Sequence, residues 1–317
     1  IITPTLKQYV LIGDPAGSTD NQIYDPATPL QVRSALRVDA RDPRWVVTNA
    51  DDRWVFTEEH PGHEYKGIAA LAIAGRVLQG YNPVLAHECI TVAEALWQQK
   101  RDTTRGLDER VVAAVELLRT TGKPIYREVL LAARDRIIAH IEDLGWAVGQ
   151  ALPLIDDTVF ATAVRTAVAH YIAEVDVLQQ ENPYSVPYRP RIWGAGWEIQ
   201  RFGVQQYFLH RAFPELVSPV YVFNALNFVL GVHPGRNTAA FASGVGARSV
   251  TVAYGFNRAD WTYIPGGVVS GTALIRPDFP ELKEFPYLWQ QVEYVMGGGA
   301  THFMFLVLAA DQLLNKV

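Results

Sequence analysis

The stretch FATAVRTAVAHYIAEVDVL, residues 160–178, carries the clearest periodic pattern in this chain of 317 residues. Its larger apolar side chains recur in steps of three and four, at Phe160, Val164, Val168, Tyr171, Val175 and Leu178. That spacing places all of them on one stripe of an α-helix. Asp156 and Asp157 precede the stretch and can cap the N-terminus of a helix. The pattern therefore predicts a long amphipathic helix whose stripe faces a core.

The same periodicity extends on both sides of this stretch. Earlier stripes run through Ile68, Leu71, Gly75 and Leu78, through Leu85, Cys89, Val92 and Leu96, through Val111, Val115 and Leu118, and through Leu130, Ala133, Ile137, Ile141 and Leu144. Later helices are predicted at 196–212, 218–230 and 300–314, and glycine or proline separates the runs at 80–83, 106, 121–124 and 145. Strand signals are confined to 53–57 and 249–254. Successive helices joined by short turns indicate an all-α array.

Two long irregular stretches, 7–63 and 233–292, interrupt this array. Loops of that length within a compact domain usually serve a function. We therefore expect a toroid of paired helices with long loops over one end, forming a single domain over residues 1–317. The chain starts at Ile1 with neither an initiator methionine nor an export signal, so we expect it to be cut from a longer protein.

The composition narrows the class of partner. The formal net charge is −5, and lysine and arginine are scattered singly rather than gathered in a basic stripe. This distribution argues against nucleic acid as a partner and suits a neutral substrate better than a polyanion. No apolar run is long enough to suggest a membrane partner. The single cysteine, Cys89, lies in an apolar helical run and is expected to be a small buried hydrophobic residue.

Three segments contain the residues that could carry chemistry. The first, NPYSVPYRPRIWGAGW at 182–197, combines prolines and glycines with Tyr184, Tyr188, Trp193 and Trp197. Aromatic rings in such a loop form either a wall that stacks against sugar rings or a plug that covers helix ends. The second segment, 230–267, is rich in glycine, which lets backbone approach a ligand closely.

The third segment, WQQVEYVMGGGA at 289–300, places Glu293 ahead of three glycines and a predicted helix. Trp289, Tyr294 and Met296 flank this glutamate and are expected to bury part of it. Burial raises the pKa of a carboxyl group toward the value that a general acid needs. His60 and His63 form no recognised metal motif, so no metal site is expected there.

These segments, in this order, resemble the family 9 glycoside hydrolases, inverting cellulase-type enzymes built on an (α/α)6 barrel. NPYSVP at 182–187 and the Trp-Gly at 193–194 are similar to the family's Pro-x-Gly-Val-Pro and Trp-Gly-Ser-Asn loop. LNFVLGVHPGR at 226–236 resembles Tyr-x-Leu-Gly-Arg-Asn-Pro-x-Gly-Arg, and PGG at 265–267 matches the Pro-Gly-Gly that follows. The resemblance covers the C-terminal two-thirds or more of the family's catalytic domain, which implies that the toroid lacks its N-terminal helices.

The resemblance implies roles for particular residues. Glu293 aligns with the general acid of the family's Asp-Asn-Glu motif, and Ala300 lies seven positions later, as the family's alanine does. The candidates to stack against sugar rings are Tyr188, Trp193, Trp197, Tyr254 and Trp261. Asn257 and Arg258 stand in the positions of the family's His-His-Arg and are expected to bind sugar hydroxyls. No cofactor is expected, and no motif indicates a structural calcium ion.

Two departures from the family affect the expected activity. Gln291 and Val292 replace the Asp-Asn before the glutamate, and the Asp-Ala-Gly-Asp motif that supplies the general base is absent. Asp14, Asp51 and Asp52 do not match that motif, and inverting hydrolysis needs a base. We therefore expect hydrolysis of a β-linked glucan or related oligosaccharide in the protein that also has the missing N-terminal segment, and no hydrolysis by residues 1–317 alone.

Two other functions stay open. A hydrolase remnant could bind glycans without cleaving them, which the absent base motif favours. A helical-toroid polysaccharide lyase would act on uronic acids and would need a Tyr/His pair and a basic cleft, which the negative net charge disfavours. By resemblance to the family, the protein is expected to be secreted or periplasmic.

Overall fold

The long stripe of residues 158–179 forms helix α8, Thr158–Gln179, in the computed structural model of the chain. The predicted inward residues Phe160, Val164, Val168 and Val175 are buried. The side chain of Asp157 accepts a hydrogen bond from the backbone N–H of Phe160 at 2.8 Å, which caps the helix. The predicted helix and its cap are therefore confirmed.

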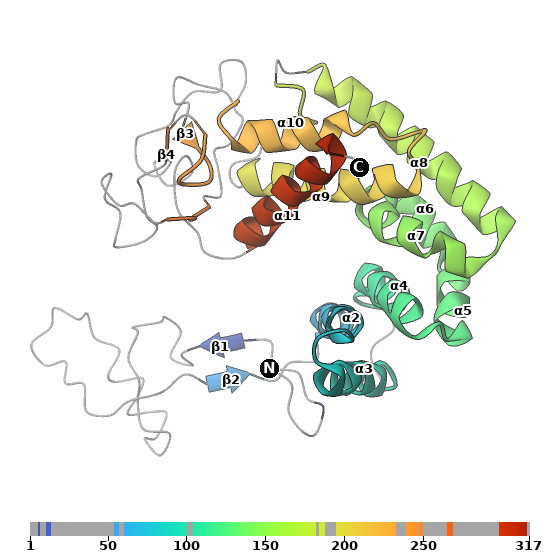
Figure 1. The fold of residues 1–317 in the computed structure, drawn as a ribbon. Helices are drawn as coiled ribbons and strands as arrows, with labels where there is room; N and C mark the ends of the chain where they lie inside the picture. The colour runs from blue at the N-terminus through green and yellow to red at the C-terminus, as the bar shows by residue number, and fades with distance from the viewer. Residues whose placement is uncertain are drawn as a thin grey trace, which may run out of the picture. The chain divides into compact units, whose positions relative to one another are not determined.

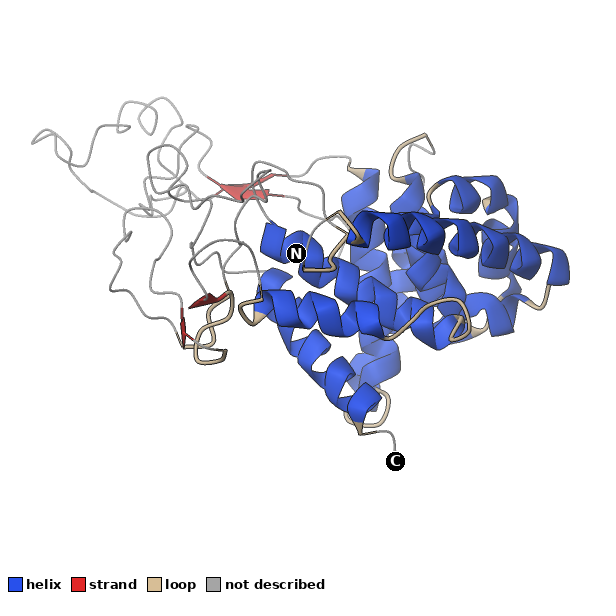
Figure 2. Ribbon diagram, turned by 90° about the horizontal axis from the view of Figure 1, so that it is seen from above, coloured by secondary structure: helices blue, strands red, loops and turns tan. Residues whose placement is uncertain are grey.

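The structure describes residues 6, 11–13, 54–56, 60–99, 104–181, 184–187, 195–232, 239–246, 248–249, 265–268 and 298–315. They fall into two compact units, Ile1–Leu130 and Leu131–Val317. Helices form the described body of each unit, with strands in two short pairs (Figure 2). The single domain predicted over residues 1–317 stays a prediction.

The first unit is built around three helices, α2 (Pro61–Leu78), α3 (Pro83–Trp97) and α4 (Leu107–Thr121), and helix α5 (Pro124–Ala132) begins in it. Helix α2 packs against both α3 and α4 (Figure 1). The N-cap predicted at residue 82 is present, since Asn82 Oδ1 accepts a hydrogen bond from the Leu85 N–H at 3.1 Å. Cys89 is buried, as predicted. Strands β1 (Leu11–Gly13) and β2 (Trp54–Phe56) pair antiparallel.

A buried carboxylate ties α2 to α4. Glu116 of α4 is 2% exposed. Its Oε2 lies 2.5 Å from Nη2 of Arg76 on α2, and its Oε1 lies 3.0 Å from Nη1 of Arg119. Arg76 also donates to Thr120 Oγ1 at 2.6 Å, and Thr120 donates in turn to the Ala72 carbonyl at 2.9 Å. This network satisfies a charged group that burial would otherwise destabilise.

The second unit contains α6 (Arg134–Ala139), α7 (Ile141–Ile155), α8, α9 (Ala195–Ala212), α10 (Val220–Val229) and α11 (Gly298–Leu314). Helix α9 packs against α7, α10 and α11, while α8 packs against α7 (Figure 1). Strands β3 (Ala239–Ala240) and β4 (Arg248–Ser249) form a short parallel pair. The helices predicted at 196–212, 218–230 and 300–314 correspond to α9, α10 and α11.

The sequence prediction was wrong around residue 145. Gly145 was predicted to separate two helices, but it lies inside α7, among the helix's buried residues. A Cβ atom built on it would lie 3.3 Å from Ile141 of the same helix and 3.4 Å from Leu209 of α9, so this position packs between its own helix and α9. The chain breaks earlier, at Ala133 and His140, which divide the predicted stripe of residues 130–144 among α5, α6 and α7.

Gly203 lies where α9, α10 and α11 meet. A Cβ atom there would lie 2.7 Å from Cβ of Ala225 on α10 and 2.7 Å from Cδ2 of Leu306 on α11, closer than such atoms can approach. We expect Gly203→Ala to overpack this junction and lower the free energy of unfolding by about 1–3 kcal/mol. Hydrogen exchange of the α9 amides measures the change, with Gly80→Ala as the control because nothing lies within 4 Å of a Cβ there. Equal exchange rates of these amides in the two variants would contradict the expected overpacking.

Candidate functional site

At the first turns of α9 and α11, described residues of the first and third sequence segments lie together with the residue that follows the second segment. Trp197, from the first segment, lies on the first turn of α9. A Cβ atom built on Gly299, from the third segment, would lie 2.7 Å from Nε1 of Trp197 and 3.2 Å from Cγ1 of Val268. Val268 directly follows the Pro-Gly-Gly turn of the second segment. The indole ring and these two residues form one cluster, called here the three-segment contact.

Backbone hydrogen bonds hold the second segment in this position. Ala242 and Val268 form an antiparallel bridge. The Ser243 N–H donates to the Gly267 carbonyl at 2.9 Å, and the Gly267 N–H donates to Ser243 Oγ at 3.0 Å. The Phe241 N–H donates to the carbonyl of Val229, the last residue of α10, at 2.7 Å. Residues 241–243 therefore link the Pro-Gly-Gly turn to the end of α10.

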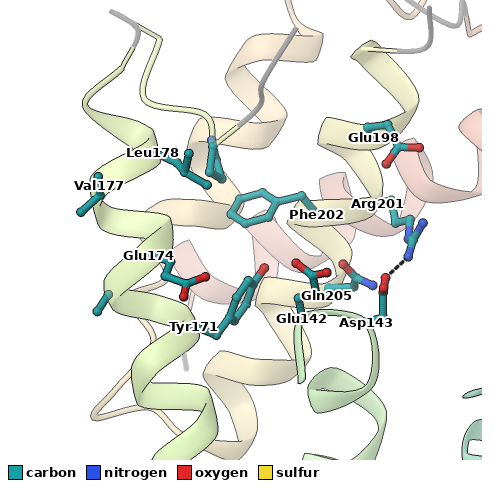
Figure 3. A pocket seen from close by; sticks show the side chains of 12 residues that line it. Glu142, Asp143, Tyr171, Glu174, Val177, Leu178, Glu198, Arg201, Phe202 and Gln205 are labelled. Carbon is teal, nitrogen blue, oxygen red and sulfur yellow. Dashed lines mark hydrogen bonds and ion pairs between the residues drawn. The ribbon is translucent and has the colours of Figure 1, made fainter. Parts of the chain in front are cut away.

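A pocket of about 930 Å³ lies beside the first turns of α9. Its walls come from the N-terminus of α7, the C-terminal half of α8 and the first turns of α9 (Figure 3). It is lined by the carboxylates of Glu142, Asp143, Glu174 and Glu198, by the rings of Tyr171 and Phe202, and by Arg201 and Gln205, among others. The lining is therefore more polar than that of most small-molecule sites, which are mainly apolar.

The charges of the pocket are predominantly negative. Arg201 of α9 donates a short hydrogen bond to Asp143 of α7, so its charge is already paired (Figure 3). Within the described part of the chain, the other charged residues that line the pocket are carboxylates. Such a lining repels anionic ligands and leaves oxygen atoms free to accept hydrogen bonds from hydroxyl groups.

Burial keeps the phenol of Tyr171 protonated. It raises the pKa of this tyrosine far above the ordinary value, and the negative charge of Glu142 raises it further. The Tyr171 hydroxyl accepts a hydrogen bond from Nε2 of Gln206 at 3.2 Å. Because a hydroxyl can accept and donate at once, Tyr171 retains its own proton to donate within the pocket.

His302, on the second turn of α11, is kept neutral by its surroundings. Burial lowers its pKa below the ordinary 6.5, and the positive charge of Arg201 lowers it further. As the pH falls, His302 therefore becomes protonated at a higher pH in the unfolded chain than in the folded chain. Stability from this group is complete above pH 6.5 and is lost as the pH falls from 6.5 toward the lower pKa of the folded state.

We expect His302→Gln to remove this part of the pH dependence. The free energy of unfolding of the variant should fall less than that of the parent between about pH 8 and about pH 5. Denaturant unfolding at both values measures the difference, and other titrating groups cancel because both proteins carry them. An identical decrease in the free energy of unfolding of the two proteins would show that His302 is not held neutral.

Most of the predicted site residues lie outside the described residues: Glu293, Tyr188, Trp193, Tyr254, Asn257, Arg258 and Trp261. The same holds for Asp14, Asp51 and Asp52. Trp197 is the described member of the predicted set. It is half-buried, with its Nε1 atom inside the three-segment contact. The assignments of an acid at Glu293 and of stacking rings stay predictions.

The sequence analysis missed the charged residues of the pocket, which lie on helices. Only the apolar stripes of these helices entered the prediction, although Glu198 directly follows Trp197 on α9. No group of three or more His, Cys, Asp or Glu side chains in the described residues could hold a metal ion. Within that same part of the chain, none of the helices combines the length and apolar character that crossing a membrane requires.

Comparison with known proteins identifies the fold. No protein-family model matches the chain, and no curated protein sequence is similar to it. Among solved structures, an endoglucanase from the termite Nasutitermes takasagoensis matches with a TM-score of 0.66 at 15% identity, over 97% of this chain and 74% of that one. AaCel9A in complex with cellobiose-like isofagomine matches with a TM-score of 0.65 at 16% identity, over 82% of this chain and 57% of that one.

A metagenome-derived glycoside hydrolase family 9 endoglucanase matches with a TM-score of 0.64 at 18% identity, over 82% of this chain and 54% of that one. The chain therefore spans little more than half the length of this endoglucanase and of AaCel9A. At these identities the shared property is the fold. The predicted all-α (α/α)6 architecture is confirmed, and the resemblance inferred from the three segments is supported independently by the structure of the chain.

Proposed function

We propose that this chain, which has the fold of the family 9 glycoside hydrolases, forms the greater part of an inverting hydrolase for a β-linked glucan or related oligosaccharide. The observation that carries the proposal is the three-segment contact. Trp197, Val268 and Gly299 belong to or directly follow the three segments whose order resembles the family, and they lie together at the first turns of α9 and α11. Residues adjacent to separate resemblances in the sequence thus lie together, which supports the proposal.

Glu293 is the general acid in this proposal. It precedes Gly299 by six residues, and six residues span at most about 20 Å when fully extended, so the chain links it to the three-segment contact. An acid protonates the leaving oxygen of the glycosidic bond while a base activates water on the opposite face of the sugar. No residue of this sequence matches the family's base motif, so the base is assigned to none of them.

The pocket favours a neutral glycan over a uronic acid. A lyase that acts on uronic acids must neutralise the carboxylate of its substrate, whereas this pocket presents Glu142, Glu174 and Glu198 and an arginine already paired with Asp143. Neutral sugars offer hydroxyl groups to these carboxylates and apolar ring faces to aromatic side chains. Tyr188, Trp193, Tyr254 and Trp261 are proposed as further stacking rings, and Asn257 and Arg258 as hydroxyl contacts.

Product stereochemistry tests the proposal. The full-length protein that contains residues 1–317 is incubated with a panel of β-linked oligosaccharides, and the first-formed anomer is followed by NMR. An inverting enzyme releases the α-anomer from a β-linked substrate. Release of the β-anomer, or of unsaturated products from a uronic acid polymer, would overturn the assignment.

Calorimetric titration of the same oligosaccharides distinguishes the remaining alternative. A protein that binds glycans but releases no product from any of them would be a binding module built on a hydrolase fold. The absent base motif favours this second function, and the comparison of binding with turnover decides between the two. Secretion or export to the periplasm is proposed for either, since the substrates of such proteins lie outside the cell.

A further inference from the structure

Two neighbouring cavities of the second unit share part of their walls. The pocket of about 930 Å³ and a second cavity of about 640 Å³ are both lined by Glu142, Tyr171 and Glu174. In Figure 3 the two carboxylate side chains lie on either side of the Tyr171 ring. The second cavity extends to α6, where Ile138 and Ala139 line it. The two cavities together are called here the carboxylate trough, and the three shared residues lie where they join.

Three carboxylates of the trough have no counter-charge. Glu142, Glu174 and Glu198 form no ion pair and no hydrogen bond with any residue that the structure describes. Arg201 is already bound to Asp143. No lysine and no other arginine among the described residues lines either cavity. Because charges of one sign in a cleft concentrate ligands of the opposite sign, the trough favours a cationic ligand.

The placement of these carboxylates suits an ammonium group better than a metal ion. A metal ion needs ligands that converge on one point, and no group of three or more His, Cys, Asp or Glu side chains in the described chain does so. Glu142, Glu174 and Glu198 come from three different helices, α7, α8 and α9. An ammonium group donates three separate hydrogen bonds, so it can be bound by carboxylates on different walls.

Other groups at the trough match the rest of a sugar. The Tyr171 hydroxyl keeps a proton to donate, and Nε2 of Gln206 donates to it at 3.2 Å. Gln206 is 0% exposed, and its Oε1 atom has no hydrogen-bond partner among the described residues. A buried amide that lacks one of its hydrogen bonds is unusual, and here it points to a donor supplied from the trough. Phe202 and Leu178 add an apolar surface for a sugar ring.

We propose that the carboxylate trough binds an amino sugar, whose ammonium group is held by Glu142 and Glu174. This inference rests on the proposed function and narrows its substrate to a β-linked glycan with free amino groups. The ligand has the opposite charge to the uronic acids that the pocket disfavours. It also gives a task to carboxylates that a fully neutral glucan would leave without a counter-charge.

The experiment compares three β-linked oligosaccharides of equal length that differ only at C2 of each sugar: a free amine, an N-acetylated amine and a hydroxyl. Calorimetric titration uses the full-length protein with Glu293→Gln, at about pH 5.5, where glutamates are ionised and the amines are protonated. The free amine should bind about 10-fold more tightly than either neutral ligand at low salt. The preference should shrink to about twofold in concentrated salt, which screens exposed charges.

Glu142→Gln and Glu174→Gln, each made separately, test the two proposed contacts. Each variant should lower the preference for the free amine by about threefold, in line with the small contribution of an exposed ion pair. Affinity for the two neutral ligands should change little. Glu215→Gln is the matched control, since it removes the same charge from an exposed pair with Arg165 that lines neither cavity. It should leave the preference unchanged.

Four outcomes would overturn the inference. They are equal affinity for the three ligands, a preference that survives both trough variants, an equal loss in Glu215→Gln, and a linear diamine that binds as tightly as the amino sugar. The last would assign an amine site that does not recognise sugar. Hydrolysis of the neutral glucan with inversion, together with any of these results, would reject only the amino sugar. Neither binding nor hydrolysis of any oligosaccharide would reject the proposed function as well.

Discussion

Glu116→Ala is expected to destabilise the helical part of the first unit more than any surface change. The carboxylate is 2% exposed and accepts hydrogen bonds from Arg76 on α2 and Arg119 on α4. Removing it leaves two arginines facing each other without the negative charge that holds them. Removal of one partner of a buried ion pair lowers the free energy of unfolding by about 3–5 kcal/mol. Because both arginines are about a quarter exposed, the lower end of that range, about 3 kcal/mol, is expected.

Hydrogen exchange of the α2 and α4 amides measures this effect locally. A chain with two units need not unfold in one step, so a single melting temperature would mix their contributions. Glu109→Gln on the same helix is the control, because the Lys66–Glu109 pair spans 3.7 Å and its lysine side chain is 70% exposed. Exposed pairs contribute about 0–1 kcal/mol. Similar exchange rates in the two variants would show that the Arg76–Glu116–Arg119 network adds no stability.

The helices could be predicted because most residues of their apolar stripes are buried, although Leu85, in the stripe predicted for α3, is exposed. The stripe of α8 has the correct period, an acidic cap at Asp157 and buried residues at the expected steps. The error at Gly145 has a physical cause. A local pattern treats glycine as a helix breaker, whereas in the folded unit Gly145 is a buried position of α7 that faces α9. That packing involves Leu209, a residue 64 positions away, which a local window does not include.

The candidate site could be predicted only in part, for a related reason. Trp197 was among the predicted stacking rings, but the sequence did not indicate that its indole ring packs against Gly299. The pocket was missed because its carboxylates come from α7, α8 and α9, and charged residues on a helix are usually interpreted as a solvated face. Only packing shows that Asp143 and Arg201, 58 positions apart, face each other.

Glu293→Gln is expected to abolish most hydrolysis while leaving glycan binding intact. The amide keeps the size and hydrogen-bonding reach of the side chain but cannot donate the proton that the leaving oxygen needs. Turnover of natural oligosaccharides, which have poor leaving groups, should fall by about 10²–10⁴-fold, the usual contribution of general acid catalysis. The dissociation constant for the same oligosaccharides, measured by calorimetry, should change little because other residues supply the contacts.

Leaving-group dependence separates an acid from a residue that only shapes the site. The acidic leaving group of an aryl glycoside departs with little protonation. Glu293→Gln should therefore slow the hydrolysis of aryl glycosides far less than the hydrolysis of oligosaccharides. Glu198→Gln is the matched control, since it makes the same change at a carboxylate that lines the pocket next to Trp197. As a binding residue, Glu198 should affect KM more than kcat, and equally for both kinds of substrate. If Glu293→Gln slowed both kinds equally, Glu293 would be a binding or structural residue. If it slowed neither, the alignment of residues 289–300 with the family would be wrong.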